Sequence, residues 1–437
     1  MRSGFSNSSV RVALVLTALT CAQSARAELQ IDITKGVSDP IPIAVVPFGQ
    51  VSAVAAVFDY AAVVAHDLDG SGRFQTMERG RLRTQPVRAA EVAPADWHAD
   101  GEDYVLVGRV GVGPQAGIDC DLVNVLTGQL LGSKHVATDA AHPRAAAHQI
   151  SDFVFEKIIG THGAFATRIA YVAVDGVPPA QRFQLIVADA DGENPQVVLD
   201  SAQPIMSPAW SADGQWLAYV SFEYRAAAVI VQQLRSGERH QVSARAGVNG
   251  APAWSPDGKR LALTLSGSGG NLDLYVLDLA TQELTRITDD PAIDTEAEWS
   301  ADGRDLYFTS DRSGGPQIYR TDVAQHRRVQ RLTFGSAYNA RPRLSPDGRL
   351  MALVSREGSD YRIAVQDLAS GSMRMLTHGN LDESPSFAPN GMSVIYAGRN
   401  AGRAALATVA IDGQVSQRLK SDRGDVREPV WGPFSGQ

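Results

Sequence analysis

The chain has 437 residues, of which 44% are hydrophobic and 20% charged, so its composition is that of an ordinary globular protein. Its length is sufficient for two domains. The formal net charge is −8, and this acidic surplus argues against a nucleic acid as partner.

Residues 1–27 have the pattern of a secretory signal peptide. The arginines near the start precede an apolar run, Val12–Leu19, which is too short to span a bilayer, and Ala25-Arg-Ala27 is a cleavage motif. The segment holds three arginines and no acidic residue, so its removal changes the net charge from −8 to −11. We therefore expect an exported protein that keeps one cysteine, Cys120, and has no internal disulfide.

Residues 28–165 have the mixed periodicity of a small α/β domain. Strand patterns occur at 41–48, 104–110, 121–126 and 129–136. Apolar residues at helical spacing predict a helix over 53–67. A second helix is predicted to begin at Pro143, where a missing N–H costs little, and to end at Gly160.

One segment of this domain matches the spacing of a calcium-binding loop. Asp67-Leu-Asp-Gly-Ser-Gly72, followed by Glu78, places oxygen ligands at positions 1, 3, 5 and 12 and glycine at position 6. The alternative is a helix end, a glycine turn and a strand through Phe74. Because residues 79–83 do not have the pattern of a second helix, we favour this alternative and predict no metal and no cofactor.

The rest of the chain, 166–437, repeats one strand–turn–strand unit. In the central copy, Pro252–Gly258, an Asp-Gly turn joins a short strand to Arg260–Ser266, where apolar and small residues alternate. The large residues that anchor successive copies are Trp210, Trp254, Trp299, Leu344, Phe387 and Trp431, with spacings of 44, 45, 45, 43 and 44. A period of about 40–45 residues with four strands indicates a β-propeller.

The two ends of the repeat array indicate how the ring closes. Trp431 has an anchor strand but too little chain after it for three more strands, while Arg168-Ile-Ala-Tyr-Val172 resembles a second strand without an anchor before it. We therefore predict six blades, with the C-terminal strand completing the blade that begins at Arg168. Closure removes the open sheet edges that would promote aggregation.

Polar loops precede the anchor strands, and the repeat places them at one end of the ring. Loops at such an end are commonly the ligand face. The alternative is that they cap the strands and solvate the channel mouth. No nucleophile elbow, zinc-protease motif or phosphate-binding loop occurs in the sequence, so we predict that the protein is not an enzyme.

Together, the blade motifs, the helix ending in Ser71-Gly-Arg-Phe74, and the linkers 147–157 and 163–171 resemble the TolB family of the Tol-Pal system. The resemblance covers nearly all of the mature chain, and the linker pair is more specific than the blade motif. It implies a monomeric periplasmic scaffold that supports outer-membrane invagination at division and outer-membrane integrity. A propeller-based hydrolase or a glycan-binding protein is the alternative.

The resemblance also implies two binding regions. The lipoprotein Pal would bind at the propeller mouth, and other envelope lipoproteins are further candidate partners, so contact with membranes would be through partners. The implied Pal-binding residues are Asn249, Thr295, Glu296, Asn339, Arg341, Asp382, Glu383, Arg427 and Glu428.

The membrane-anchored partner TolA would bind a tail within 28–40, chiefly Glu28, Leu29, Ile31 and Ile33. The alternation of apolar and polar residues there suits strand addition to a sheet edge. The alternative is that the segment is a permanent edge strand of the α/β domain. Gly36 and Pro40 favour a hinge and therefore a tail that exchanges between the two states.

Overall fold

The structure is a computed structural model that describes residues 40–50, 58–111, 116–267, 269–325, 328–400, 402–419 and 423–434. The predicted signal peptide and nearly all of the predicted tail lie outside these residues. Among the described helices, none has the length and apolar character needed to cross a membrane.

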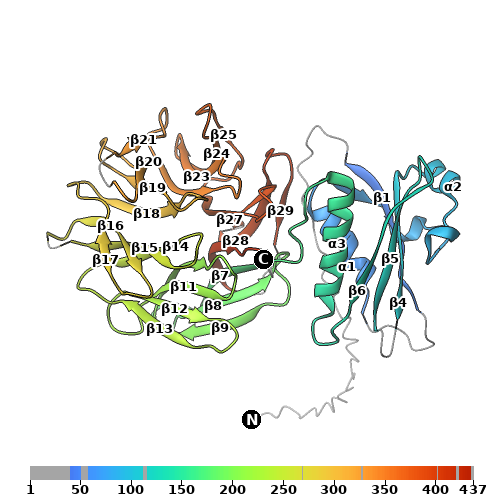
Figure 1. Cartoon of the computed structure of the whole chain (residues 1–437), viewed down its shortest axis with the longest axis horizontal. Helices are drawn as coiled ribbons and strands as arrows, with labels where there is room; N and C mark the ends of the chain where they lie inside the picture. Colours follow the sequence, from blue (N-terminus) through green and yellow to red (C-terminus); the bar gives the residue numbers. More distant parts are fainter. Residues whose placement is uncertain are drawn as a thin grey trace, which may run out of the picture. The chain divides into compact units, whose positions relative to one another are not determined.

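The N-terminal region contains one mixed sheet (Figure 1). Its strands are β1 (Ile41–Val45), β2 (Gly49–Gln50), β3 (Phe74–Thr76), β4 (Tyr104–Gly111), β5 (Gly117–Asn124) and β6 (Gln129–Ala137). The main order is β3-β1-β4-β5-β6, and β2 also pairs with β4. β1 is parallel to both β3 and β4, whereas β4, β5 and β6 are antiparallel neighbours.

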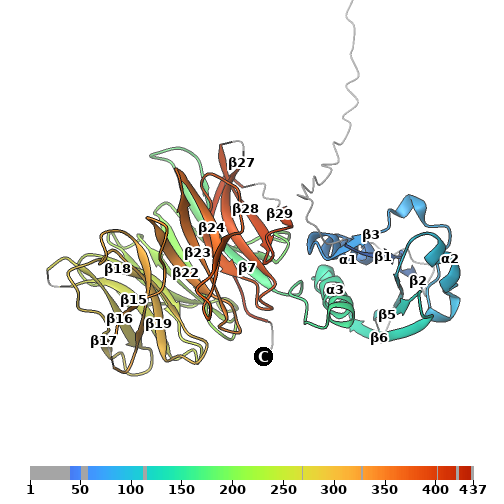
Figure 2. The same ribbon diagram turned by 90° about the horizontal axis from the view of Figure 1, so that it is seen from above.

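Helices α1 (Tyr60–Gly70) and α3 (Pro143–Ile159) lie side by side (Figure 2). α3 has the predicted bounds, because Pro143 occupies its first turn and Gly160 ends it in the left-handed conformation (φ 83°). The predicted helix over 53–67 is wrong at residues 58 and 59, because α1 begins at Tyr60; residues 51–57 lie outside the described part of the chain. Asp59 accepts a hydrogen bond from the amide of Ala62 (3.0 Å), which caps the helix at Tyr60.

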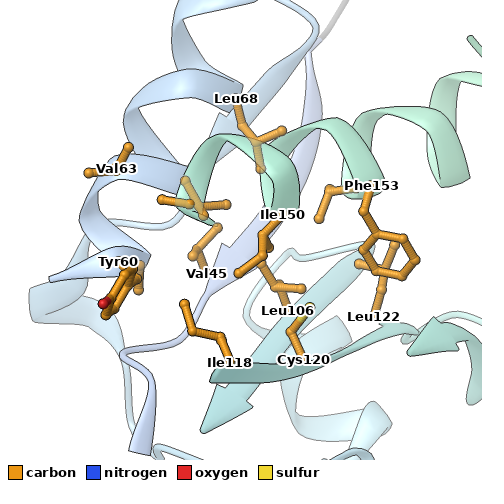
Figure 3. Close-up of a cluster of buried hydrophobic side chains, with 14 of the residues drawn as sticks. Val45, Tyr60, Val63, Leu68, Leu106, Ile118, Cys120, Leu122, Ile150 and Phe153 are labelled. Carbon is orange, nitrogen blue, oxygen red and sulfur yellow. The ribbon is translucent and has the colours of Figure 1, made fainter. Parts of the chain in front are cut away.

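Both faces of the sheet are covered. On one face, Ile43, Leu106 and Leu122 pack against residues of α1 and α3 such as Leu68 and Ile150 (Figure 3). On the other face, a smaller cluster forms beneath the short helix α2 (Pro94–Ala99), which the sequence pattern did not reveal, and two single-turn 3-10 helices, Arg79–Arg81 and Ala89–Glu91. Because both faces are buried, β1 and β4 have continuous apolar runs rather than strict alternation.

The segment that matches a calcium loop is the end of α1 followed by a turn into β3. Asp67 is buried, and its carboxylate accepts hydrogen bonds from His148 Nδ1 (2.8 Å) and Ser151 Oγ (2.6 Å). The carboxylate of Asp69 accepts from the amide and hydroxyl of Thr76 (2.7 and 2.6 Å). These carboxylates therefore fix the helix end to α3 and β3.

Six four-stranded antiparallel sheets form the propeller (Figure 1). The first complete blades are β10 (Ile205–Trp210), β11 (Trp216–Ser221), β12 (Ala228–Gln233), β13 (Arg239–Ser243); β14 (Asn249–Trp254), β15 (Arg260–Ser266), β16 (Leu272–Asp278), β17 (Leu284–Arg286); and β18 (Asp294–Trp299), β19 (Asp305–Ser310), β20 (Gln317–Asp322), β21 (Gln330–Arg331). They continue with β22 (Asn339–Leu344), β23 (Leu350–Glu357), β24 (Asp360–Asp367), β25 (Met373–Met375) and with β26 (Glu383–Phe387), β27 (Ser393–Asn400), β28 (Arg403–Ala410), β29 (Ser416–Arg418).

The sixth blade combines the two ends of the repeat region, as predicted. β30 (Asp425–Trp431) is its first strand, and β7 (Arg168–Asp175), β8 (Arg182–Asp189) and β9 (Gln196–Ser201) complete it. β30 pairs antiparallel with β7, with Trp431 opposite Ile169. The indole N–H of Trp431 also donates to Thr167 Oγ1 (2.8 Å), so the C-terminal strand closes the ring.

Candidate functional site

The first strand of every blade has a register shift at the same point. Each shift contains one non-glycine residue with a positive φ: Ser207 (52°), Ala251 (43°), Glu296 (56°), Arg341 (56°), Ser384 (55°) and Glu428 (50°). Such conformations are uncommon for these residue types, and they concentrate at functional sites. The propeller therefore repeats one strained backbone position six times.

These six residues line one cavity, of about 40 Å³, together with neighbouring residues such as Pro208, Pro252, Arg343 and Pro385. Since each blade contributes its first strand, the cavity lies where the six first strands meet, in the axial channel. The strand bulge turns one side chain per blade toward this channel.

Charged side chains in the channel are paired with each other. Arg341 Nε donates to Glu296 Oε1 (2.7 Å), and Arg341 Nη1 donates to the hydroxyl of Ser384. In two other neighbouring blades, the amide of Ser207 donates to the carboxylate of Glu428. Two carboxylates and one guanidinium thus lie among the six bulged residues, and Arg343 adds a second guanidinium to the cavity lining.

The pKa of Arg341 reflects this crowding. Burial alone would lower the pKa of the guanidinium, but the carboxylates of Glu296, Glu428 and Glu383 outweigh burial and raise it. Arg341 therefore stays charged, and its side chain remains 29% exposed. An acceptor group that enters the channel would therefore meet a charged hydrogen-bond donor.

Three of the predicted binding residues are buried. Asn249 Oδ1 accepts from Ser243 Oγ (2.6 Å), and Asn339 Nδ2 donates to Gln317 Oε1 (3.0 Å). Asp382 accepts from the amide of Gly379 (3.1 Å), and its burial raises its pKa. At these three positions the buried side chains secure the turns before the first strands, which is the capping role considered as the alternative for these loops.

The other predicted residues lie nearer the channel. Glu296, Arg341 and Glu428 line it directly. Thr295 is half-buried, and its hydroxyl lies 3.3 Å from that of Thr264. Glu383 and Arg427 are half-buried residues next to the bulges of β26 and β30.

Sequence reasoning missed Ser207, Ala251 and Ser384, although the sequence contains a signal for them. Five of the six channel residues directly precede a proline, and only Glu296 precedes an alanine. A proline restricts the backbone of the residue before it and keeps that residue out of the right-handed helical region. The sequence signal for the channel lining was therefore the residue before the proline in each repeat, and not the polar loop upstream of it.

Within the described residues, one group has the spacing of a metal site: ligand atoms of Asp67, His148 and Asp191 lie within 4.8 Å of one another. Arg144 pairs with Asp191, while His148 and Ser151 donate to Asp67. Protein donors and cations already satisfy these carboxylates. The tail residues Glu28, Leu29, Ile31 and Ile33 lie outside the described part of the chain.

Comparison with known families agrees with this architecture. The model of the TolB beta propeller domain matches residues 155–435, and that of the TolB amino-terminal domain matches 29–131. The chain belongs to the TolB family. The family match therefore covers both the channel-bearing propeller and much of the α/β region.

Individual relatives extend the TolB likeness over almost the whole chain. The Tol-Pal system protein TolB of Methylococcus capsulatus is 50% identical over 418 residues, which cover 95% of this chain and 96% of that protein. The Tol-Pal system protein TolB of Xylella fastidiosa is 44% identical over 424 residues, covering 96% and 95%. The crystal structure of TolB from Acinetobacter baumannii, 40% identical, superposes with a TM-score of 0.85 and covers 93% of this chain and all of that one.

Proposed function

We propose that this protein is a non-enzymatic periplasmic adaptor of the Tol-Pal system, which binds Pal at the axial channel and TolA through residues 28–40. Relatives of similar length are Tol-Pal system proteins, and the signal-peptide pattern at 1–27 supports export. The observation that carries the Pal proposal is the ring of six bulged residues, one from each blade, around a polar cavity.

Polar groups in the channel are suited to binding a protein loop. Arg341 and Glu428 are held in place by bonds to Glu296, Ser384 and the Ser207 amide. A loop of Pal that enters the cavity would exchange some of these bonds for bonds of its own. Partly buried charged pairs at the centre of an interface contribute strongly to affinity and to its specificity.

Titration calorimetry with purified Pal from the same organism tests this site. Arg341→Glu should weaken Pal binding at least about tenfold, because it places a fourth carboxylate among Glu296, Glu383 and Glu428; tenfold corresponds to about 1.4 kcal/mol. The matched control is Arg320→Glu, the same reversal on the outer strand β20, where the side chain is 42% exposed. Unchanged affinity in Arg341→Glu would exclude the channel as the Pal site.

The smaller substitutions sharpen the assignment. Glu296→Ala should weaken Pal binding and leave Arg341 free to move, whereas Asp382→Ala should chiefly destabilise the turn at Gly379. Thermal melting of both variants separates the two effects. An Asp382→Ala protein that melts normally and loses Pal would place Asp382 in the binding surface.

For the tail, the proposal is that Glu28–Thr34 pairs with TolA as an added strand. Deleting residues 28–34 should abolish TolA binding and leave melting and Pal binding unchanged. A deletion protein that still binds TolA would refute the tail as the site, and one that unfolds would support a permanent strand. A pull-down from envelope extract that yields no Pal, with turnover of a peptide or glycan instead, would favour the hydrolase alternative.

A further inference from the structure

Three tryptophans end the first strands of consecutive blades, but one of them differs from the other two. Trp210 Nε1 donates to the carbonyl of Val430 (3.2 Å), and Trp299 Nε1 donates to the carbonyl of Ala253 (3.1 Å). The indole N–H of Trp254 is buried, and no hydrogen-bond acceptor for it occurs among the described residues. An unpaired buried donor costs free energy, so the difference needs a reason.

An arginine covers each of the two paired tryptophans. The guanidinium of Arg168 lies 5.1 Å from the ring centroid of Trp210, and its Nη2 donates to the carbonyl of Gly214 (2.9 Å). Arg260 lies 4.7 Å from the ring of Trp299 in the same arrangement. Each arginine begins the second strand of one blade and covers the tryptophan of the next, with a cation–π contact and a bond to the Asp-Gly turn.

Among the residues that the structure describes, no arginine covers Trp254. The corresponding first residue of β11 is Trp216. The turns after the two tryptophans differ in how closely they are packed. A Cβ added to Gly303, in the turn after Trp299, would lie 3.6 Å from Arg260 Nη2, whereas a Cβ added to Gly258, in the turn after Trp254, would have no atom within 4 Å. The turn beside Trp254 therefore lacks the donor that bonds its counterpart.

A second change widens the same place. A Cβ built at Gly303 would also meet Pro256, at 3.7 Å, but the residue equivalent to Pro256 in the preceding blade is Ala212. The result is an open groove of about 900 Å³ between the two blades, with Trp216, Val242 and Trp254 among its lining residues. No other position of the repeat discussed above combines an uncovered tryptophan with an open turn.

The rim of this groove is acidic. Asp213 and Asp257 line it and are exposed, and each uses one carboxylate oxygen, Oδ1, to hold its own turn. His240 also lines the groove, 6.1 Å from Trp216 between ring centroids, but neither lysine nor arginine occurs among the lining residues. The groove thus combines an aromatic wall with two rim carboxylates, and the cations near Asp257, Arg260 and Lys259, are not among its lining residues.

We propose that this groove binds an arginine side chain of a partner polypeptide. The guanidinium would occupy the place that Arg168 and Arg260 occupy in the neighbouring blades, stacking on Trp254 and donating to the carbonyl of Gly258. The rim carboxylates complement its charge. The indole N–H of Trp254 is buried and takes no part in binding. The site is independent of the axial channel and of the proposed partners.

A capped peptide, acetyl-Gly-Ala-Arg-Ala-Gly-amide, tests the proposal on the full mature chain. The chain has six tryptophans, so the ¹H–¹⁵N spectrum of the indole groups reports each one, and Trp254→Phe and Trp216→Phe assign two of the signals. Titration should shift the Trp254 and Trp216 signals saturably, with a Kd on the order of 1 mM for a single side chain. The same peptide with citrulline in place of arginine, which is neutral and nearly isosteric, should shift them at least about tenfold less per unit concentration.

Two variants make the result decisive. Trp216→Arg should place an arginine of the chain itself over Trp254 and abolish the peptide-induced shift. Ala212→Pro should narrow the groove as Pro256 does in the next blade, and it covers the case in which Trp216→Arg fails to fold. The proposal is overturned if the arginine peptide shifts neither signal, if the citrulline peptide shifts them equally, or if a disaccharide of N-acetylglucosamine does so, which would identify a saccharide site.

Discussion

The α/β domain and the propeller distribute their buried cores differently. In the α/β domain, one large cluster joins β1, β4, β5, β6, α1 and α3, so most elements contact a single core. In the propeller, separate clusters lie within and between neighbouring blades. Damage should therefore spread through the first domain and remain local in the second, except where the ring closes.

Repeat architectures explain the difference. When each unit contacts only its neighbours, stability is approximately a sum of unit and interface contributions. A closed ring adds one contact set that no other blade can replace, the pairing of β30 with β7. Truncations and substitutions in the two regions therefore test this contrast.

Deleting residues 425–437 should have the largest effect. It removes β30, so β7 keeps only β8 as a neighbour and becomes an exposed sheet edge, which promotes aggregation. Calorimetry should show loss of the main unfolding transition, and size-exclusion chromatography should show association. Deleting only residues 435–437 leaves β30 intact and serves as the control; a longer truncation that melts normally would refute closure by the C-terminal strand.

Trp431→Ala tests closure with one side chain. Trp431 packs against the cluster that contains Ile169 and Tyr171, and its N–H donates to Thr167. Losing this packing should lower the free energy of unfolding by roughly 3–5 kcal/mol. Denaturant titration measures the change, and a loss below about 1 kcal/mol would mean that the ring does not depend on this anchor.

In the α/β domain, Ile150→Ala should destabilise the common core. Ile150 is fully buried between α3 and the sheet (Figure 3). The expected loss is about 2–5 kcal/mol, seen by denaturant titration followed at the α/β domain. Gln149→Ala, at an exposed position of the same helix, is the control and should change stability little.

A buried ion pair gives the α/β domain a pH dependence. Burial alone would lower the pKa of His148, but Asp67, Asp189 and Asp191 outweigh it and raise the pKa to about 10. A raised histidine pKa stabilises the folded state most below the ordinary value of about 6.5. Stability should therefore fall as the pH rises from about 6.5 to 10.

Melting temperatures across this pH range measure the effect. His148→Gln should flatten the dependence and, by removing one partner of a buried pair, cost on the order of 1–3 kcal/mol at neutral pH. His240→Gln, at an exposed position of β13, is the control and should leave the pH profile unchanged. A His148→Gln protein with the wild-type profile would contradict the assignment.

A matched pair of glycines should show the smallest effect. Gly160 ends α3 with φ 83°, and Gly258 forms a blade turn with φ 68°; in both cases a Cβ would meet no atom within 4 Å. Alanine at either position should cost about 1 kcal/mol, entirely from the left-handed backbone. Unequal losses by denaturant titration would show that one of the turns rearranges.

Features that depend on local pattern could be predicted from the sequence. The period of 43–45 residues predicted six four-stranded blades and the closing role of Trp431, because each blade repeats the same turn and the same alternation. Pro143 and Gly160 predicted both ends of α3, since each acts through its own backbone. The TolB likeness was also readable from linkers and blades together.

Features that depend on residues far apart in the chain could not be predicted from local pattern and became visible in the folded chain. The order β3-β1-β4 requires parallel pairings that no local pattern specifies. Asn249, Asn339 and Asp382 are polar, and only the fold shows that their partners bury them. The uncovered Trp254 depends on Trp216 of the neighbouring blade, because the residue that covers each anchor comes from a different repeat. The polarity of a residue is known from its type, but whether it is buried, or left without a covering side chain, depends on which other residues the fold places beside it.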